Sequence, residues 1–379
     1  MSTVIIDLEQ AVDTRDVIHR IVEFLAQGKL VAIPTETVYG IAASALQPAA
    51  VERLRDFKKR DASKPFALAL QSGEQCLDFV PDISPLALRL SRRAWPGPVT
   101  LVLNADHPES ALWQLEKTVQ EAVCPSGTVG FRVSPHEMLE QVLSLSAGPI
   151  VLTSANQPGK PPAIDDSVTE LDGHVDLIIK GGPTYFKNPS SVVAVDGAKL
   201  NFLRDGVVDR QSIEQMGGFI GVVVCTGNTC RSPMGEAIFR KQIAEKIGCP
   251  LEKLEENGIT ILSAGIAAGP GASAANQSME VMESWGLDIS NHQSRPVTAR
   301  LANYADLILT MTSGHRQAIV SQWPTLESRV KTVRSDGGDI SDPIGSPVEI
   351  YQACAKQIDE SLKQWTSRID FGQFRYETA

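Results

Sequence analysis

The stretch Val222-Val223-Val224-Cys225-Thr226-Gly227-Asn228-Thr229-Cys230-Arg231-Ser232-Pro233 decides the fold of the second half of the chain. The apolar run before Cys225 predicts a buried strand, and Pro233 suits the first turn of a helix. The residues between them are short and polar and include a glycine, so they predict a tight loop. Such a loop presents backbone N–H groups and a helix N-terminus to an anion.

Cys225 and Arg231 give this loop its predicted chemistry. Five residues separate them, so a thiolate and a guanidinium can face one phosphate. A helix N-terminus and a nearby cation stabilise a thiolate, and arginine can bind two phosphoryl oxygens. Ser232 can donate a hydroxyl hydrogen bond to the sulfur. The pattern predicts phosphoryl transfer to Cys225 and hydrolysis of the thiophosphate, whereas Cys225 alone would be read as a small buried apolar side chain.

Length and composition indicate a two-domain globular protein. The chain has 379 residues, 42% hydrophobic and 21% charged. No apolar run approaches the roughly 20 residues of a membrane span, and no signal-peptide pattern begins the sequence. Six scattered cysteines form no disulfide framework, and a nucleophilic thiol suits a reducing compartment, so we expect a cytoplasmic protein without a membrane partner. A net charge of −10 argues against broad non-specific nucleic-acid binding.

The hydrophobic pattern predicts domains at 1–207 and 219–379, joined by a short linker at 208–218. In the second domain, apolar strands alternate with helices, which predicts a doubly wound, parallel, four-stranded sheet with ligands at the carboxyl ends of strands. The predicted strands are 219–224, 259–262, 305–311 and 330–333, and the predicted helices are 234–247, 273–285 and 348–365.

Asp342 is the candidate general acid of this domain. A phosphoryl leaving group must collect a proton, and Asp342 lies in a Pro/Gly loop just before the last helix. Alone, an aspartate there would be read as a turn former or helix cap. Its pairing with Cys225 favours the catalytic interpretation.

The second domain resembles the low-molecular-weight protein tyrosine phosphatase family over its whole length. The resemblance rests on residues 225–233 and on Asp342-Pro343 near the end. It implies Cys225 as the nucleophile, Arg231 as the phosphate clamp and Asp342 as the general acid. The remaining loop residues would support the thiolate or set specificity, and they are Thr226, Gly227, Asn228, Thr229, Cys230 and Ser232.

Within that family the loop resembles the bacterial protein arginine phosphatases more than the tyrosine phosphatases. Tyrosine-specific members usually carry a bulkier aliphatic residue in place of Thr229, so the resemblance implies a phosphoarginine substrate on proteins. Ile344 follows Asp342-Pro343, where members of both groups commonly have an aromatic residue, and it leaves phosphotyrosine open as the alternative. Arsenate reductases share the loop, but Cys249 and Cys354 are far apart and form no paired motif. Cys230 could form a protective disulfide with Cys225, or simply be a buried loop cysteine.

The first domain shows frequent short strands and predicts a twisted, mixed α/β sheet with several antiparallel pairs. Helices are predicted at 14–26 and 49–57. The predicted strands are 30–33, 66–70, 99–103, 129–133, 150–152, 175–179 and 191–195. The sequence contains no Walker-type glycine loop and no cluster of metal ligands.

Several short motifs stand at strand or helix ends of this domain. Each has a bland explanation as a turn or a solvated helix end. The set is Pro34-Thr35-Glu36-Thr37-Val38-Tyr39-Gly40, Lys58-x-Arg60, Pro96-Gly97-Pro98-Val99-Thr100, Ser154-x-Asn156, Ser190-Ser191-Val192 and Leu203-Arg204-x-Gly206. Together and in this order they resemble the threonylcarbamoyl-AMP synthase family over residues 8–207.

The resemblance implies that L-threonine, bicarbonate and ATP condense with release of pyrophosphate, for N6-threonylcarbamoyladenosine in tRNA. Mg²⁺ would enter with ATP rather than through a protein cage. The implied partners are the threonylcarbamoyl-transfer machinery, tRNA and, for the second domain, phosphorylated proteins. The implied ATP-binding residues are Lys58, Arg60, Thr128, Ser154, Asn156 and Arg204, and the implied threonine-binding residues are Thr35, Arg132, Thr153 and Ser190.

The first domain also departs from that family's pattern. Residues 60–66 lack the proline, the Asn-Pro-Leu and the histidine that family members commonly carry, and Asp205 stands where proline commonly follows the arginine. The competing interpretation is a non-catalytic RNA-binding module. The predicted whole is a bifunctional enzyme, with a phosphotyrosine phosphatase fused to such a module as the alternative.

Overall fold

The computed structural model describes residues 2–59, 64–374 and 377–378. The chain forms two compact units, Met1–Met216 together with Glu377–Ala379, and Gly217–Tyr376. A helix, α7 (Arg210–Gly217), occupies most of the range predicted as a linker. Among the described residues no helix is both long and apolar enough to cross a membrane.

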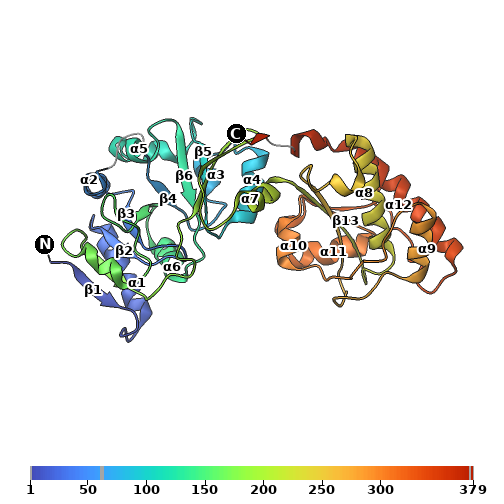
Figure 1. Ribbon diagram of the computed structural model, residues 1–379, viewed down its shortest axis with the longest axis horizontal. Helices are drawn as coiled ribbons and strands as arrows, with labels where there is room; N and C mark the ends of the chain where they lie inside the picture. Colours follow the sequence, from blue (N-terminus) through green and yellow to red (C-terminus); the bar gives the residue numbers. More distant parts are fainter. Residues whose placement is uncertain (1, 60–63, 375–376, 379) are drawn as a thin grey trace. The chain divides into compact units, whose positions relative to one another are not determined.

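The first unit is built on a mixed, 11-stranded sheet whose order is β1-β8-β2-β3-β7-β4-β6-β5-β9-β10-β15 (Figure 1). The sheet contains antiparallel pairs such as β3–β7 and β5–β6 and parallel pairs such as β4–β6 and β5–β9. The strands are β1 (Val4–Asp7), β2 (Val31–Ile33), β3 (Gly40–Ser44), β4 (Ala67–Ala69), β5 (Val99–Asn104), β6 (Thr128–Arg132), β7 (Ile150–Ser154), β8 (Leu177–Lys180), β9 (Ser191–Asp196), β10 (Lys199–Arg204) and β15 (Glu377–Thr378).

Helices bury apolar stripes against this sheet. Helix α1 begins after Asp13, whose side chain accepts from Arg15 N and so satisfies an otherwise free amide. Its buried residues, among them Ile18 and Ile21, pack with α6 and with β2 and β8 in one apolar core. The helices of this unit are α1 (Thr14–Ala26), α2 (Pro48–Lys58), α3 (Cys76–Phe79), α4 (Pro85–Ala94), α5 (Lys117–Val123) and α6 (Glu137–Leu145).

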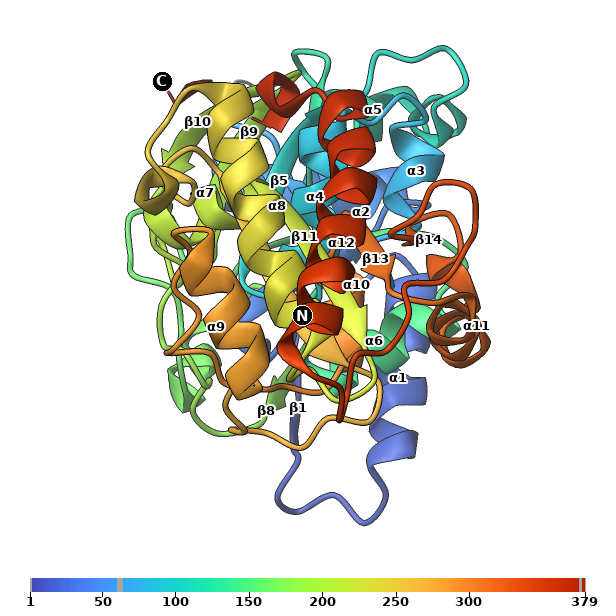
Figure 2. The same cartoon turned by 90° about the vertical axis from the view of Figure 1, so that its right-hand side faces the viewer.

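The second unit is a four-stranded parallel sheet, in the order β12-β11-β13-β14, with helices on both faces. Alternate residues of β11 enter two different cores: Val223 packs with α8 and α12, whereas Val222 and Val224 pack with α10 and α11. Figure 1 shows α8 and α12 on one face of the sheet and α10 and α11 on the other, and Figure 2 shows α8 beside α12. The elements are β11 (Phe219–Cys225), α8 (Arg231–Ile247), β12 (Ile259–Gly265), α9 (Asn276–Ser284), α10 (Ala299–Tyr304), β13 (Leu307–Thr310), α11 (Ser313–Gln322), β14 (Val330–Thr332) and α12 (Val348–Arg368).

Both predicted fold classes are confirmed. The structure adds four strands that the pattern did not predict: β1, β3, β10 and the two-residue β15. Strand β3 reads Gly-Ile-Ala-Ala-Ser, which lacks the β-branched enrichment that marks a strand in sequence. Its pairing with β2 and β7 in the sheet supplies the stability that its composition does not.

Candidate active sites

The loop at residues 226–230 connects β11 to α8, at the carboxyl end of the central strand. Asn228 has φ 56°, in the left-handed region that asparagine tolerates better than most residues. Gly265 ends the neighbouring β12, and a Cβ there would lie 2.5 Å from Thr226 O and 2.9 Å from Asn228 N. The loop can take its path only because these two positions carry asparagine and glycine.

The sulfur of Cys225 lies inside this loop, and the residue is 3% exposed. It accepts a hydrogen bond from Asn228 N at 3.3 Å, and Ser232 Oγ lies 3.0 Å away. Asn228 Nδ2 donates to that same Oγ at 2.9 Å, which leaves the Ser232 hydroxyl hydrogen for another acceptor. The sulfur and Ala264 O, 3.3 Å away, are the two acceptors in reach.

A second layer of contacts holds Asn228. Arg295 N donates to its Oδ1 at 2.8 Å, and His292 Nε2 lies 2.7 Å from its carbonyl oxygen. A carbonyl only accepts, so His292 must carry its hydrogen on Nε2. Asn228 is fully buried, and these bonds satisfy its polar groups.

Arg231 is almost fully buried, and its guanidinium is held from several sides. One nitrogen donates to Ile340 O at 3.2 Å, and the other forms a close ion pair with the Asp342 carboxylate. The Arg231 side chain is 5% exposed and that of Asp342 40%, so the carboxylate lies at the mouth of the loop. Ile344 N donates to Asp342 at 3.2 Å and orients it. The predicted nucleophile, clamp and acid therefore lie together.

Cys230 points into the apolar core next to Tyr351 of α12, with 3.5 Å between the sulfur and the hydroxyl oxygen. Burial raises the pKa of Tyr351, and it raises that of the nearby Cys354 to about 12. Thr229 O accepts from Ala275 N at 2.8 Å, and the Thr229 hydroxyl lies 3.7 Å from Cys230 Sγ. All six cysteines are free thiols.

His315 belongs to this site, although the sequence interpretation did not include it. Its Nε2 lies 2.9 Å from Thr226 Oγ1, which also accepts from Arg231 at 3.4 Å. His315 follows β13 in the same way that the loop follows β11. The rule that ligands bind at carboxyl ends of parallel strands could have identified it.

In the first unit, Arg132 ends β6 and forms a buried ion pair with Glu36, each side chain being 8% exposed. Ser134 donates to the other Glu36 oxygen, and Arg132 donates to Thr37 Oγ1 at 3.3 Å. Thr37 in turn lies 3.0 Å from Thr35 Oγ1, whose own hydrogen goes to a backbone carbonyl. Glu36 stands in the motif that the sequence analysis singled out, but it was not assigned to the site. Ser134 was not predicted.

Lys58, the last residue of α2, joins two other predicted residues. Its Nζ donates to Ser154 O at 3.1 Å, to Asn156 O at 2.9 Å and to Asn156 Oδ1 at 2.7 Å. The Ser154 hydroxyl donates to the same Oδ1 at 2.7 Å. Arg60, predicted to act with Lys58, lies outside the described residues.

Arg204 forms a third cluster with Ser190. It donates to Ser190 O at 2.8 Å and to Ser190 Oγ at 3.0 Å. Desolvation of its guanidinium and the charge of Arg132 both lower the pKa of Arg204. Thr128 instead lies near Ser126, with 3.5 Å between the hydroxyl oxygens, at the opposite end of β6 from Arg132.

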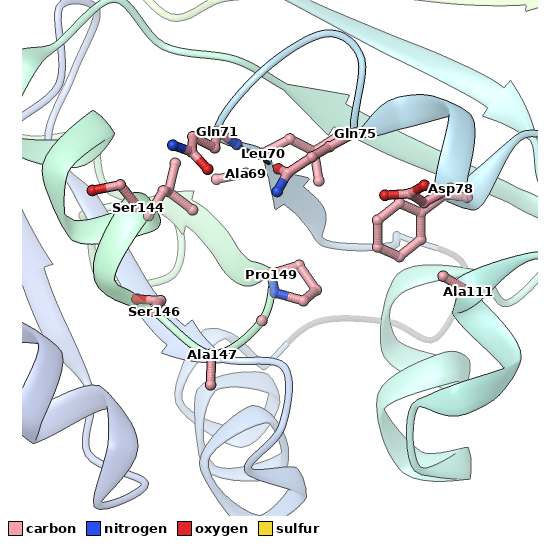
Figure 3. Close-up of a pocket in the computed structure, with 13 residues that line it drawn as sticks. Ala69, Leu70, Gln71, Gln75, Asp78, Ala111, Ser144, Ser146, Ala147 and Pro149 are labelled. Carbon is pink, nitrogen blue, oxygen red and sulfur yellow. Dashed lines mark hydrogen bonds between the residues drawn. The ribbon is translucent and has the colours of Figure 1, made fainter.

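Thr153 is buried in β7, directly before Ser154. A separate hollow in this unit lies beside the end of β4 and the segment after α6 (Figure 3). Gln71, Gln75 and Ser144 are among its 13 lining residues, and none of the predicted site residues is among them. The hollow is therefore distinct from the three clusters.

Two family models match the chain. Sua5_yciO_yrdC, described as telomere recombination, covers residues 23–206, and low molecular weight phosphotyrosine protein phosphatase covers residues 221–373. A solved structure of a doubly substituted Pyrococcus abyssi Sua5 matches with a TM-score of 0.51 at 24% identity, over 87% of this chain and 98% of that one. That likeness concerns the fold alone.

Individual relatives match each half. The threonylcarbamoyl-AMP synthase of Pyrococcus abyssi is 37% identical over 203 residues, which are 52% of this chain and only 56% of the archaeal protein. A putative threonylcarbamoyl-AMP synthase of Mycobacterium tuberculosis is 32% identical over 50% of this chain and 84% of its own length. The protein-arginine-phosphatase of Bacillus subtilis is 36% identical over 39% of this chain and 95% of its own length.

Both halves thus have counterparts among proteins named as enzymes. The chain belongs to the Sua5/YciO/YrdC family through its first half and to the low-molecular-weight phosphotyrosine protein phosphatase family through its second half.

Proposed function

We propose that the chain is a bifunctional enzyme, in which residues 219–379 are a cysteine-dependent protein phosphatase and residues 1–207 a threonylcarbamoyl-AMP synthase, joined at 208–218. The convergence of Cys225, Arg231 and Asp342 on one loop carries the phosphatase proposal. A thiol that accepts an amide hydrogen bond at 3.3 Å, beside a buried guanidinium, is poised to receive a phosphoryl group.

The phosphatase reaction proceeds in two displacements. In the first, Cys225 Sγ forms a bond to phosphorus, the bond to the leaving nitrogen or oxygen breaks, and Asp342 gives that atom a proton. In the second, water attacks phosphorus, the S–P bond breaks and Asp342 recovers the proton. Arg231 must pass from Asp342 to the phosphoryl oxygens, which the exposure of Asp342 allows.

We propose phosphoarginine on proteins as the substrate. Thr229 places a small polar side chain at the position where bulk would restrict a branched guanidinium. The similarity to the Bacillus subtilis protein-arginine-phosphatase supports this choice.

Phosphoarginine and phosphotyrosine forms of one peptide test the choice. Wild type should have the larger kcat/KM on phosphoarginine, and Thr229→Ile should lower it selectively. Thr229→Ser is the matched control, because it keeps a small hydroxyl side chain. A wild-type preference for phosphotyrosine would overturn the substrate assignment without touching the cysteine mechanism.

For the first half, we propose that the three polar clusters bind ATP, L-threonine and bicarbonate. Threonine's amine and bicarbonate form a carbamate with loss of water. The carbamate oxygen then bonds to the α-phosphorus of ATP, and the bond to pyrophosphate breaks. Lys58 and Arg204 would stabilise the charge on the phosphates, and Arg132 suits the threonine carboxylate.

Threonine must compete with existing partners at this site. Arg132 is already neutralised by Glu36, and the Thr35 hydroxyl is engaged with Thr37 and a carbonyl. We therefore propose that Thr35 and Arg132 shape the threonine site, and that Arg132 meets the substrate with the N–H groups that Glu36 and Thr37 do not take. Mg²⁺ would be held by the phosphates of ATP; among the described residues no group of three His, Cys, Asp or Glu side chains is placed for it.

Pyrophosphate release from ATP by the full chain tests this half. Release should require both L-threonine and bicarbonate and should persist in a Cys225→Ser background. Lys58→Ala should abolish it, because Lys58 joins the Ser154 and Asn156 cluster. RNA binding without pyrophosphate release would instead support the non-catalytic module.

A further inference from the structure

His315 is a buried titratable group that the phosphatase reaction as described does not use. It lies in the first turn of α11, where Thr312 Oγ1 accepts from its backbone N at 3.1 Å. Asp339 Oδ1 accepts from Ser313 N at 2.7 Å, so the start of the helix is fixed on two sides. His315 is 6% exposed, and its imidazole faces the loop rather than solvent.

The contacts of the ring determine its tautomer. Nδ1 is buried and has no partner among the described residues, while Nε2 lies 2.9 Å from Thr226 Oγ1. Buried N–H groups without a partner are rarer in proteins than buried acceptors without one, because an unpaired donor costs free energy. We therefore assign the lone pair to Nδ1. The hydrogen therefore sits on Nε2 and is donated to Thr226.

Thr226 Oγ1 then accepts from two sides, from His315 and from Arg231 at 3.4 Å. With both lone pairs engaged, its own hydroxyl hydrogen has to point elsewhere. Thr226 is exposed at the mouth of the loop, next to the Arg231–Asp342 pair, where a phosphoryl group would lie.

We propose that His315 is a positioning residue of the phosphatase, which turns the Thr226 hydroxyl hydrogen toward the bound phosphoryl group and supports Arg231 through the same oxygen. This inference rests on the proposed phosphatase function. It adds a side-chain donor to the loop, and it links anion binding to the protonation of one histidine.

The charges around His315 give the direction of that linkage. In the empty loop, burial and the nearby Arg231 lower the pKa of His315, while Asp342 and Asp339 oppose the shift. A bound dianion offsets the Arg231 charge and raises the pKa of His315 again. Binding then takes up a proton, so anion affinity should increase as pH falls through the interval between the two pKa values.

Sulfate is the probe for this linkage, because it stays a dianion over the range of about pH 5 to about pH 8 where histidine titrates. Sulfate affinity of the full chain should rise toward low pH in wild type and should be flatter in His315→Gln, whose amide keeps a donor near Nε2. Asp342 and Cys225 are present in both proteins, so a difference between the two profiles is assigned to position 315. Identical pH profiles for the two proteins would overturn the proposal.

Steady-state kinetics test the positioning role separately. His315→Leu and Thr226→Val should each raise KM by about 10-fold with a smaller change in kcat, as expected for one hydrogen bond to a charged ligand. The double variant should resemble either single variant, and His315→Gln should restore most of the loss. Additive losses, or no rescue by glutamine, would show a merely structural histidine.

The two proposals fail in different ways. A wild type without activity on any phosphopeptide would refute the phosphatase function, while the sulfate profile would still report on His315. An active wild type whose sulfate binding and KM are unaffected by these variants would refute only the inference. Thr226→Val provides the kinetic test if His315→Leu does not fold.

Discussion

Each half of the molecule contains a buried arginine paired with a carboxylate, but the two pairs differ in the freedom of the acid. Glu36 is as buried as Arg132 and is also held by Ser134. Asp342 is 40% exposed and lies on a loop, while Arg231 is 5% exposed. A buried carboxylate stays paired with its arginine, because separating them would leave two uncompensated charges in the interior. An exposed carboxylate can be replaced by phosphate as the partner of the arginine, and it can then act as an acid.

The two sites also differ in how they are assembled. The phosphatase loop is one contiguous segment at the end of β11, so local sequence builds most of it. The clusters of the first unit draw on residues separated by about a hundred positions, such as Lys58 with Ser154 and Glu36 with Arg132. A substitution in the phosphatase loop should therefore affect mainly that loop. A substitution in a cluster of the first unit should also affect the packing between the elements that the cluster joins.

Cys225→Ser should separate the two sites most sharply. Loss of the nucleophile should lower phosphatase kcat by about 10⁵-fold or more, as for other nucleophile knockouts. ATP-dependent pyrophosphate release should be unchanged, because Ser232 and Asn228, which are hydrogen-bonded to Cys225, belong to the second unit. Phosphopeptide and pyrophosphate assays on one preparation measure both, and joint loss of the two activities would contradict independent sites.

Asp342→Ala tests whether the exposed carboxylate is the acid. We expect kcat to fall by about 10³-fold, within the range for general acid catalysis. A substrate with a leaving group that needs no proton, such as a nitrophenyl phosphate, should lose much less. Equal losses on both substrates would show that Asp342 acts only by holding Arg231.

Glu36→Gln and Asp342→Asn compare the two ion pairs directly. Removing one charge from the buried pair should cost about 3 kcal/mol of unfolding free energy, because Arg132 would be left uncompensated. The matched change at Asp342 should cost under about 1 kcal/mol, since the Asp342 side chain is 40% exposed and water already screens its charge. Hydrogen exchange read in each unit measures both, as a two-unit chain need not unfold in one step. Similar losses of unfolding free energy in the two variants would show that burial of the carboxylate does not distinguish the two ion pairs.

Ser232→Ala should have a smaller effect, confined to the loop. It removes the hydroxyl 3.0 Å from the Cys225 sulfur and leaves Asn228 Nδ2 without its acceptor, so kcat should drop by about 10-fold. Ser361→Ala is the control: that serine is also buried, but it bonds only Gln357 O within α12. An equal drop in the control would point to general loosening of the unit.

The smallest effect is expected at Cys354. Its pKa of about 12 leaves only about one part in 10⁴ as thiolate near pH 8, so iodoacetamide should hardly label it. Labelling should increase only as pH rises toward that value. Cys249 is partly exposed and serves as the reference in the same mass-spectrometric measurement. Equal labelling of both cysteines would contradict the burial of Cys354.

The phosphatase half was the more predictable from sequence, for a physical reason. Strand β11, its loop and α8 are consecutive, so spacing alone brings Cys225 to Arg231. Asp342 could be proposed because the chemistry requires an acid. His315 was missed, since its relation to Thr226 depends on β13 lying beside β11 in the sheet.

In the first half, resemblance named the residues but could not show how they are engaged. Nothing local predicts that Arg132 is already paired with Glu36, or that Lys58 joins Ser154 and Asn156. Strand β3, which was not predicted, pairs Gly40 with Ser154 and thereby joins the segment after β2 to the end of β7.

The sequence by itself determined the two families, the two fold classes and the contiguous loop from Cys225 to Arg231, because these depend on local pattern and short spacing. Only the tertiary structure decided that the Asp342 carboxylate is exposed while that of Glu36 is buried, and that His315 contacts the loop. Those properties depend on burial and on strand neighbours far apart in the chain, and burial sets whether a charge can leave its partner.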